Sequence, residues 1–505
     1  MVAPVKITRV LVLGGGTAGL LSALTLKAQL PRLDIRIVRS REMGVIGVGE
    51  GSTVGLPSFL HGLLKIDPKA FFREAQPTWK LGLRFVRWGP RTHFHYSFSP
   101  SMHRRWQGLS KLAGFYCDEE MIWASHGIAL MEADRVFLRQ PDGSPRMARE
   151  VGYHLENKLF VDFLERQAEK CGIPLIDDTM TEVRQDEQGI TGISLANGGD
   201  QTADLYVDCS GFGSALLGRT LDEKFRSFRT TLFCDRAVVG GWVRGEEPIK
   251  PYTSVETKAA GWCWQIEHEH RINSGYVYSS AFISDEEAER EFRARNPLVD
   301  SVRVVPFVSG RYERAWVKNV VAVGNACGFV EPLEATSLGA ICSEAAHLME
   351  ILVDSGCEPS PSLVRLFNQR TAESWDNIRR FLGIHYRYNT ALDTPFWRAC
   401  RADTELAGAE PIVEFFEENG PSDLGRQALL SPFDQFTMDG WLTLLVGQRV
   451  PYRKQHVPSN LEAATWRKVN DQNRAQVKNA FTIPQGLAMV RSPAWRWNLE
   501  AFQLR

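Results

Sequence analysis

The chain has 505 residues, of which 44% are hydrophobic and 24% charged, and its 59 Lys and Arg nearly balance 60 Asp and Glu. This composition is close to the average of globular proteins, which excludes disordered, collagen-like and coiled-coil classes, and the length allows about three structural units. The near-zero net charge gives no general attraction to nucleic acid or anionic lipid, so we expect a small-molecule ligand.

The nine cysteines form no CxxC pair and no Cys/His cluster with the spacing of a zinc site. We therefore expect reduced, mostly buried thiols and no metal. The N-terminal residues show no charged leader followed by an apolar segment, and the sequence contains no run of about 18 apolar residues. The prediction is a soluble cytoplasmic protein.

The first predicted element is a buried parallel strand over residues 10–13, Val-Leu-Val-Leu, which runs into a glycine turn and then a helix. The turn matches GxGxxG, whose first glycine makes the tight turn, whose second admits a pyrophosphate and whose third packs the helix on the strand. This context predicts a dinucleotide site, although a glycine-rich turn without a ligand is the alternative. The predicted cofactor-binding residues here are Gly14, Gly16, Thr17, Ala18 and Gly19.

The second predicted strand covers residues 35–38 and ends next to Arg39. In the dinucleotide-binding pattern an acidic residue about 20 positions after the last glycine accepts the ribose hydroxyls, and here that position holds Arg39. Either Glu42 or Glu50 binds the ribose instead, or Arg39 lies against the adenosine. A glycine-dense loop over residues 47–53, with Gly49 and Glu50, could place its backbone against a flat ring or an anion, but an ordinary surface turn has the same pattern.

Two later segments repeat the strand-then-glycine pattern. Residues 205–211 and 320–328 each predict a buried strand that ends in a turn, and a helix with apolar residues at helical spacing follows from about Thr336. Such units, far apart in the chain, indicate a sheet assembled around one extended cofactor. The predicted fold class is α/β with a Rossmann-like dinucleotide-binding sheet.

Five motifs together resemble the flavin-dependent halogenases related to tryptophan halogenase. They are the glycine turn 14–19, the loop 47–53, the segment 77–85 (PTWKLGLRF), the run 262–266 (WCWQI) and the segment 324–336 (GNACGFVEPLEAT). The glycine motifs occur in many flavoproteins, whereas the combination of the last three is specific to this family. The resemblance spans roughly residues 7–400.

The resemblance implies a flavin monooxygenase-type fold that binds FAD, reduced flavin supplied by a separate flavin reductase, and oxidation of chloride or bromide by O2 to hypohalous acid. It further implies that hypohalous acid reaches Lys80 beside the substrate, and that Glu334 stabilises the attacked ring or removes its proton. The pattern alone would make Lys80 a solvated strand lysine and Glu334 a helix N-terminal charge. A lysine suits the chemistry, because its ammonium can hydrogen-bond hypohalous acid and its neutral amine can form a haloamine.

The same resemblance assigns further residues. Gly324, Gly328 and Leu333 are expected at the flavin, and Thr336 and Ser337 at the halide, where a helix N-terminus favours an anion. The sequence Glu-Ala-Thr-Ser over residues 334–337 stands where tryptophan halogenases usually carry Glu-Ser-Thr-Gly, which leaves the choice between chloride and bromide open.

The remaining assignments concern the substrate side. Trp262 and Trp264 are expected to keep the substrate away from the flavin, which suppresses direct monooxygenation. His93, His95 and Phe98 lie where the family lines its aromatic pocket, with a purely structural role for the histidines as the equal alternative.

The predicted organisation is an FAD- and halide-binding module over residues 1–350, with an inserted segment at about 91–150, and a mainly helical substrate-covering region over residues 351–505. The residues with which tryptophan halogenases hold the amino acid's carboxylate and ammonium have no match, so an indole or another electron-rich arene fits better than free tryptophan. A carrier-tethered substrate stays open, and homodimers are common in the family.

Two other functions compete with halogenation. A flavin-dependent aromatic hydroxylase would share the glycine motifs, but it would not require Lys80 and would use NAD(P)H itself. A non-catalytic flavin-binding protein would produce only peroxide from reduced flavin and oxygen.

Overall fold

The computed structural model describes residues 6–43, 49–99, 108–111, 114, 116–117, 121–147, 150–422, 424–453, 455–498 and 502. Residues 47 and 48 of the predicted glycine-dense loop lie outside this description, as do 100–107 and several other positions of the predicted inserted segment.

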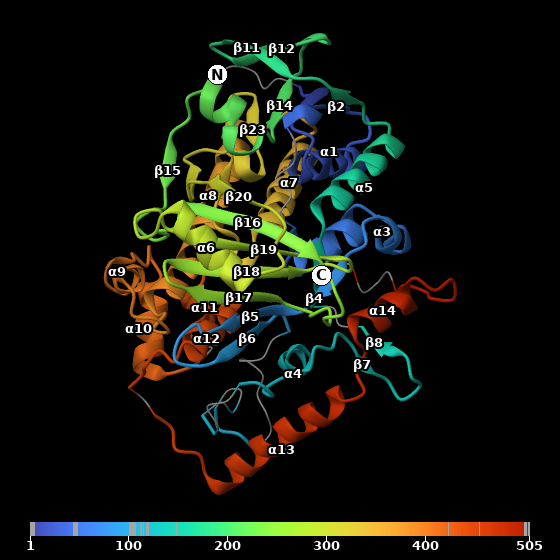
Figure 1. Ribbon diagram of the computed structural model, residues 1–505. Coiled ribbons are helices and arrows are strands. Elements are labelled where there is room, and N and C mark those ends of the chain that lie inside the picture. The colour runs from blue at the N-terminus through green and yellow to red at the C-terminus, as the bar shows by residue number, and fades with distance from the viewer. Residues whose placement is uncertain are drawn as a thin grey trace.

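A six-stranded sheet lies at one end of the molecule (Figure 1), with its strands in the order β10-β2-β1-β14-β23-β22. All neighbouring pairs are parallel except β22 with β23. The strands predicted from continuous apolar runs lie side by side in this sheet, as expected for parallel strands that are buried on both faces. This confirms the α/β class. The strands are β1 (Arg9–Leu13), β2 (Asp34–Arg39), β10 (Leu175–Asp177), β14 (Leu205–Asp208), β22 (Trp316–Val317) and β23 (Val320–Ala322).

Three helices pack with this sheet. The first follows the glycine turn directly and contacts the other two. They are α1 (Thr17–Gln29), α5 (Asn157–Lys170) and α7 (Ser337–Asp354).

A seven-stranded sheet forms the second layer, in the order β20-β16-β19-β18-β17-β5-β6, and it is antiparallel except where β17 meets β5. Helix α6 (Asp285–Arg295) packs on β16 and β19. The strands are β5 (Gly82–Val86), β6 (His93–Ser97), β16 (Arg236–Val243), β17 (Thr253–Lys258), β18 (Gly261–Glu267), β19 (Arg271–Tyr278) and β20 (Val302–Pro306).

Four small sheets complete the β-structure, and one of them, β3-β9-β4, carries Lys80. Its strands are β3 (Glu50–Gly51), β4 (Thr78–Lys80) and β9 (Gly152–Leu155). The others are β7 (Leu138–Arg139) with β8 (Pro145–Arg146), β11 (Met180–Asp186) with β12 (Gly189–Leu195) and β13 (Gly199–Gln201), and β15 (Phe225–Ser227) with β21 (Gly310–Tyr312) and β24 (Gly328–Phe329).

After α7 the described secondary-structure elements are all helices, several of which begin at a Ser or Thr cap followed by proline, as at Ser360 and Thr394. One hydrophobic core joins them to the six-stranded sheet, and α12 packs on β6 (Figure 1). They are α8 (Pro361–Arg387), α9 (Pro395–Asp403), α10 (Glu410–Asn419), α11 (Arg426–Leu429), α12 (Thr437–Gly447), α13 (Asn460–Val477) and α14 (Ile483–Val490).

The remaining helices are α2 (Gly55–Pro57), α3 (Pro68–Glu74) and α4 (His126–Glu132). The division of the chain near residue 350 and the inserted segment stay predictions. Within the described part of the chain, no helix is at once long and apolar enough to cross a membrane.

Candidate functional site

The glycine turn between β1 and α1 has the shape that a dinucleotide needs. Gly14 has φ of +124°, and a β-carbon there would lie 2.2 Å from the Cys209 carbonyl oxygen. A β-carbon on Gly19 would lie 1.9 Å from the Gly14 oxygen, so both positions require glycine. By contrast, among the described residues a β-carbon on Gly16 would meet no heavy atom within 4 Å, and none of their side chains caps the N-terminus of α1. The open space and the free N–H groups fit a pyrophosphate.

Arg39 lies at the C-terminal end of β2, beside this turn. A β-carbon on Gly15 would lie 2.5 Å from Arg39 Cβ, and the Arg39 guanidinium forms an ion pair with Glu165 of α5. Glu42 is exposed. Arg39 therefore forms one wall of the turn. That Arg39 lies against the adenosine of the cofactor stays a prediction.

Gly49 and Glu50 lead into β3. Gly49 has φ of +70°, and a β-carbon there would lie 2.6 Å from both Asn273 Nδ2 and His268 Nε2. Glu50 pairs with Leu155 of β9, and burial raises the pKa of its carboxyl to about 7. The carboxyl is thus divided between its charged and neutral forms near neutral pH.

The second glycine segment meets the first. A β-carbon on Gly324 would lie 3.0 Å from Ala18 Cβ of α1, and the Gly324 N–H donates to Glu344 Oε2 at 2.7 Å. A β-carbon on Gly328 would lie 3.0 Å from Trp375, and Leu333 is fully buried. The structure therefore brings Gly324 to the glycine turn although 300 residues separate them in the sequence.

Lys80 is the last residue of β4 and is 0% exposed. Its Nζ has no hydrogen-bond partner among the described residues and lies 5.3 Å from the centre of the Phe98 ring. A β-carbon on Gly51 would lie 3.1 Å from Nζ, so a side chain at residue 51 would crowd the amine. Burial, opposed by the charge of Glu334, lowers the pKa of Lys80 to about 7. In a large fraction of the molecules, Lys80 is therefore a neutral, nucleophilic amine at neutral pH.

Glu334 ends the short 3-10 turn Pro332–Glu334, which precedes α7, and is 2% exposed. Its Oε1 lies 2.7 Å from Nε2 of His385 on α8. Burial and then the charge of Glu334 raise the pKa of Tyr96 on β6 well above its usual value. Glu334 is thus close enough to act electrostatically on both Lys80 and Tyr96.

Thr336 and Ser337 begin α7. Thr336 is 2% exposed, and its side chain makes no capping hydrogen bond to the helix. Ala335 before it adopts a left-handed conformation with φ of +54°. A β-carbon on Gly339, in the first turn of α7, would lie 3.3 Å from Thr53 Oγ1, which sets this helix end against the segment that follows β3. The halide assignment stays a prediction.

His93 and His95 lie on one face of β6, and both place Nε2 2.9 Å from Glu132 Oε2. Neither hydrogen-bonds to Lys80 or Glu334 in the described part of the chain. Burial lowers the pKa of His95 to about 4. Of the three residues expected in the substrate pocket, only Phe98 contacts Lys80.

Residues on α8 and β6 were missed by the sequence argument. Tyr96 lies on the other face of β6 from the histidines, with its ring centre 6.2 Å from that of Phe381. Phe381 in turn stacks on Phe436 at 3.7 Å and meets His385 edge-on. The alternation along β6 was the available signal, because it separates Tyr96 from both histidines.

The predicted tryptophan pair is buried in β18. Trp262 is 0% exposed, and its Nε1 donates to the Tyr386 hydroxyl at 2.8 Å. That hydroxyl donates in turn to the Glu331 carboxyl, whose pKa burial raises to about 8. Trp264 is 4% exposed and packs against Gly275. Trp262 is therefore fixed through Tyr386 to the segment that carries Glu334.

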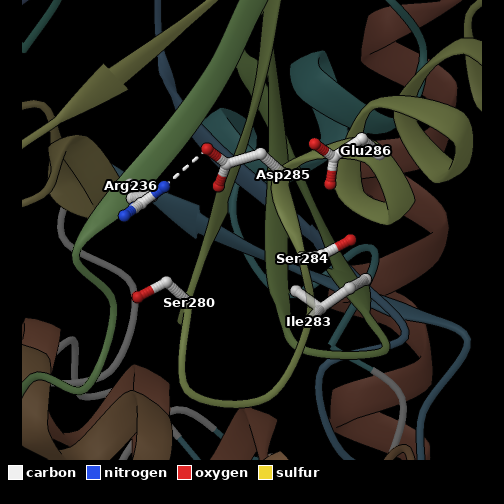
Figure 2. A pocket seen from close by; sticks show the side chains of 6 residues that line it. All are labelled: Arg236, Ser280, Ile283, Ser284, Asp285 and Glu286. Carbon is white, nitrogen blue, oxygen red and sulfur yellow. Dashed lines mark hydrogen bonds and ion pairs between the residues drawn. The ribbon is translucent and has the colours of Figure 1, made fainter.

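A pocket of about 320 Å³ at the start of α6 (Figure 2) contains none of the predicted site residues. Arg236 of β16 reaches across it to Asp285 at 2.5 Å, and the Ser284 hydroxyl caps α6. The Arg236, Asp285 and Ser284 side chains in this pocket already make structural hydrogen bonds, so the pocket is not the candidate site.

Comparison with known proteins agrees with this geometry. The family model described as tryptophan halogenase matches residues 9–462. The chain is 29% identical to tryptophan 7-halogenase RebH of Lentzea aerocolonigenes, over 86% of this chain and 87% of that protein. It is 33% identical to tryptophan 7-halogenase KtzQ of Kutzneria sp. (strain 744), over 83% of each chain.

Solved structures give the same result. MibH, described as a "lathipeptide tryptophan 5-halogenase", superposes with a TM-score of 0.88 at 37% identity, covering 98% of this chain and 95% of MibH. BrvH, a flavin-dependent halogenase from Brevundimonas sp. BAL3, superposes with a TM-score of 0.84 at 27% identity, covering 96% of this chain and all of BrvH.

Proposed function

The chain belongs to the tryptophan halogenase family and is a flavin-dependent halogenase, and we propose that it chlorinates or brominates an indole or a similar electron-rich ring through Lys80. Electrophilic substitution needs a nucleophilic ring, an electrophilic halogen held close to it, and a base for the ring proton. Each of these requirements corresponds to a feature of the site.

Lys80 is the observation that carries the proposal. An unpaired lysine that is fully buried is costly, and a purely structural role would not explain it. Since its pKa is about 7, the amine can accept a hydrogen bond from hypohalous acid or take the halogen itself. A hydroxylase has no use for such an amine, which disfavours that alternative.

The residues of the glycine turn and the Gly324 segment fit FAD, because Gly16 borders open space at an uncapped helix N-terminus. FAD held there would, once reduced by a separate flavin reductase, bring O2 to the peroxide level, at which it can take two electrons from the halide. Thr336 and Ser337 would hold chloride or bromide at the start of α7. Their side chains and the first N–H groups of the helix offer donors to an anion.

Glu334 would take up the charge and the proton of the attacked ring. The carboxyl is 2% exposed, so its electrostatic effect is little screened by water. Phe98 beside Lys80, and Tyr96 and Phe381 near Glu334, would offer flat apolar surfaces to an indole.

The substrate is proposed as an indole ring. RebH and KtzQ are named as tryptophan halogenases and MibH as a tryptophan halogenase for a peptide of the lanthipeptide type, so the ring could belong to free indole, to the amino acid or to a peptide. The absence of a recognisable carboxylate and ammonium site in the sequence favours a ring without the free amino acid group.

The test is mass spectrometry of indole, tryptophan and a tryptophan-containing peptide, each incubated with the protein, FAD, a flavin reductase, NADH and O2, with chloride or bromide in separate reactions. A halogen isotope pattern that requires the protein and disappears in Lys80→Met supports the proposal. Lys258→Met is the matched control, because that buried lysine is paired with Glu256 at 2.9 Å and should retain activity. A mass gain of one oxygen atom would favour the hydroxylase instead.

A further inference from the structure

His385 and Glu334 share one proton in their hydrogen bond, and this proton can lie on either side chain. The Nδ1 atom of His385 lies 3.0 Å from the carbonyl oxygen of Phe381, which can only accept a hydrogen bond, so Nδ1 carries a hydrogen. The Nε2 atom lies 2.7 Å from Glu334 Oε1. A hydrogen bond there needs a proton on Nε2 or on the carboxyl, so the pair is either imidazolium with carboxylate or imidazole with carboxylic acid. Both arrangements have the same number of protons and no net charge.

The surroundings isolate this pair. The two side chains are 0% and 1% exposed. Apolar rings face His385 from three sides: Phe85 of β5 with centres 5.3 Å apart, Trp88, and Phe381 of its own helix. Among the described residues, the charged group that contacts His385 is Glu334.

Glu334 has two titratable neighbours of its own, Lys80 of β4 and Tyr96 of β6. The backbone beside His385 is fixed as well, because the Trp88 indole N–H donates to its carbonyl at 3.2 Å.

Building on the proposed function, we propose that His385 is a positioning residue that shares one proton with Glu334 and holds that proton as imidazolium when the Glu334 carboxyl accepts the proton of the ring. The halogen first leaves its oxygen or nitrogen carrier and bonds to a ring carbon, which makes the ring cationic. Glu334 Oε2 then accepts the hydrogen of that carbon as a proton, and the C–H electron pair restores the aromatic ring. The proton between Oε1 and Nε2 rests on His385, so the pair ends as carboxylic acid and imidazolium.

This arrangement explains why a histidine accompanies the carboxyl. A buried glutamic acid without a charged partner favours its protonated form and then cannot act as a base. With His385 beside it, the shared proton can move to the imidazole, and the carboxyl can receive the proton of the ring. The Phe381 carbonyl, bonded to Nδ1, favours the imidazolium that results.

The shared proton can be tested without turnover. Protein labelled with ¹⁵N-histidine should show one strongly deshielded N–H proton signal, which is lost in both His385→Gln and Glu334→Gln. A signal that persists in Glu334→Gln would overturn the shared proton. Unfolding midpoints and FAD binding of the variants establish that they fold.

The role in the reaction is tested with ring-deuterated and ordinary indole. In His385→Gln, removal of the ring proton should become the slow step, with a rate lower by about 10²-fold and a primary isotope effect absent from the wild type. Lys258→Met is the control, because Lys258 is paired with Glu256 and not with Glu334, and it should show no isotope effect.

Equal rates with ordinary and deuterated indole in His385→Gln would overturn the role of His385. So would a double variant, His385→Gln with Glu334→Gln, whose loss of rate is the sum of the two single losses in free energy, since the losses of residues that act as a unit do not add. If the wild type halogenates no arene, the proposed function fails, and the N–H signal still decides whether the proton is shared.

Discussion

Replacing Lys80 by methionine should stabilise the folded protein while it abolishes halogenation. Lys80 is 0% exposed and its amine has no described hydrogen-bond partner, so folding removes its charged form from water without compensation. The pKa falls from 10.5 to about 7 in the folded state. At 1.36 kcal/mol per pKa unit, this difference corresponds to about 3 to 5 kcal/mol of stability.

The sign of the pH dependence follows from the two pKa values. Below pH 7 Lys80 is protonated in both states, and the folded protein bears the full cost of the buried charge. Between pH 7 and 10.5 the folded protein loses the proton while the unfolded chain keeps it, so the cost shrinks, and above 10.5 it is gone. The gain of Lys80→Met should therefore be largest at pH 6 and small at pH 10.

The assay is urea unfolding of the two proteins without FAD at pH 6, 8 and 10, followed by tryptophan fluorescence. Methionine has a similar length and no charge, so it should fill the same space. Lys258→Met is the control, because loss of the 2.9 Å ion pair to Glu256 should leave stability unchanged or lower. A Lys80→Met protein that is no more stable at pH 6, or equally favoured at pH 6 and 10, would refute the reasoning.

Four further outcomes follow from the geometry. Gly16→Val should weaken FAD binding, measured by flavin fluorescence, with little change in the unfolding midpoint, because the valine side chain would enter open space. Gly19→Ala should lower stability by about 1–3 kcal/mol, because the alanine β-carbon would lie 1.9 Å from a carbonyl oxygen. Glu334→Gln should slow product formation by about 10²-fold while a trap still detects hypohalous acid. Trp262→Phe should cost about 1 kcal/mol through the lost hydrogen bond to Tyr386, and equal unfolding midpoints would contradict this.

The sequence was sufficient for the dinucleotide-binding half of the fold. Strands β1, β14 and β23 are apolar runs that lead into glycine turns, and such local patterns persist in the folded state because parallel strands are buried on both faces. The register places Val10 beside both Ile35 and Leu205, so the predicted strands are neighbours. The family assignment from the combined motifs is confirmed.

The environment of Lys80 could not be read from alternation. The pattern treated residues 79–85 as one strand, with Lys80 on the face of Gly82 and Arg84. In the structure β4 ends at Lys80, and β5 begins at Gly82 in a different sheet, so the alternation does not continue through Leu81. Burial of the amine depends on Phe98 and Gly51, which come from other elements.

The link between the helical C-terminal region and the chemistry was also hidden, because it depends on two adjacent residues of α8. His385 meets the carboxyl of Glu334, and Tyr386 donates to the carboxyl of Glu331, at the other end of the same turn. The helix therefore does more than cover a pocket. It fixes both ends of the turn that carries Glu334, and it connects that turn to Trp262 in the second sheet. Because these contacts join segments some 50 to 120 residues apart, any change in how α8 packs should alter the position of the Glu334 carboxyl and the position of Trp262 together.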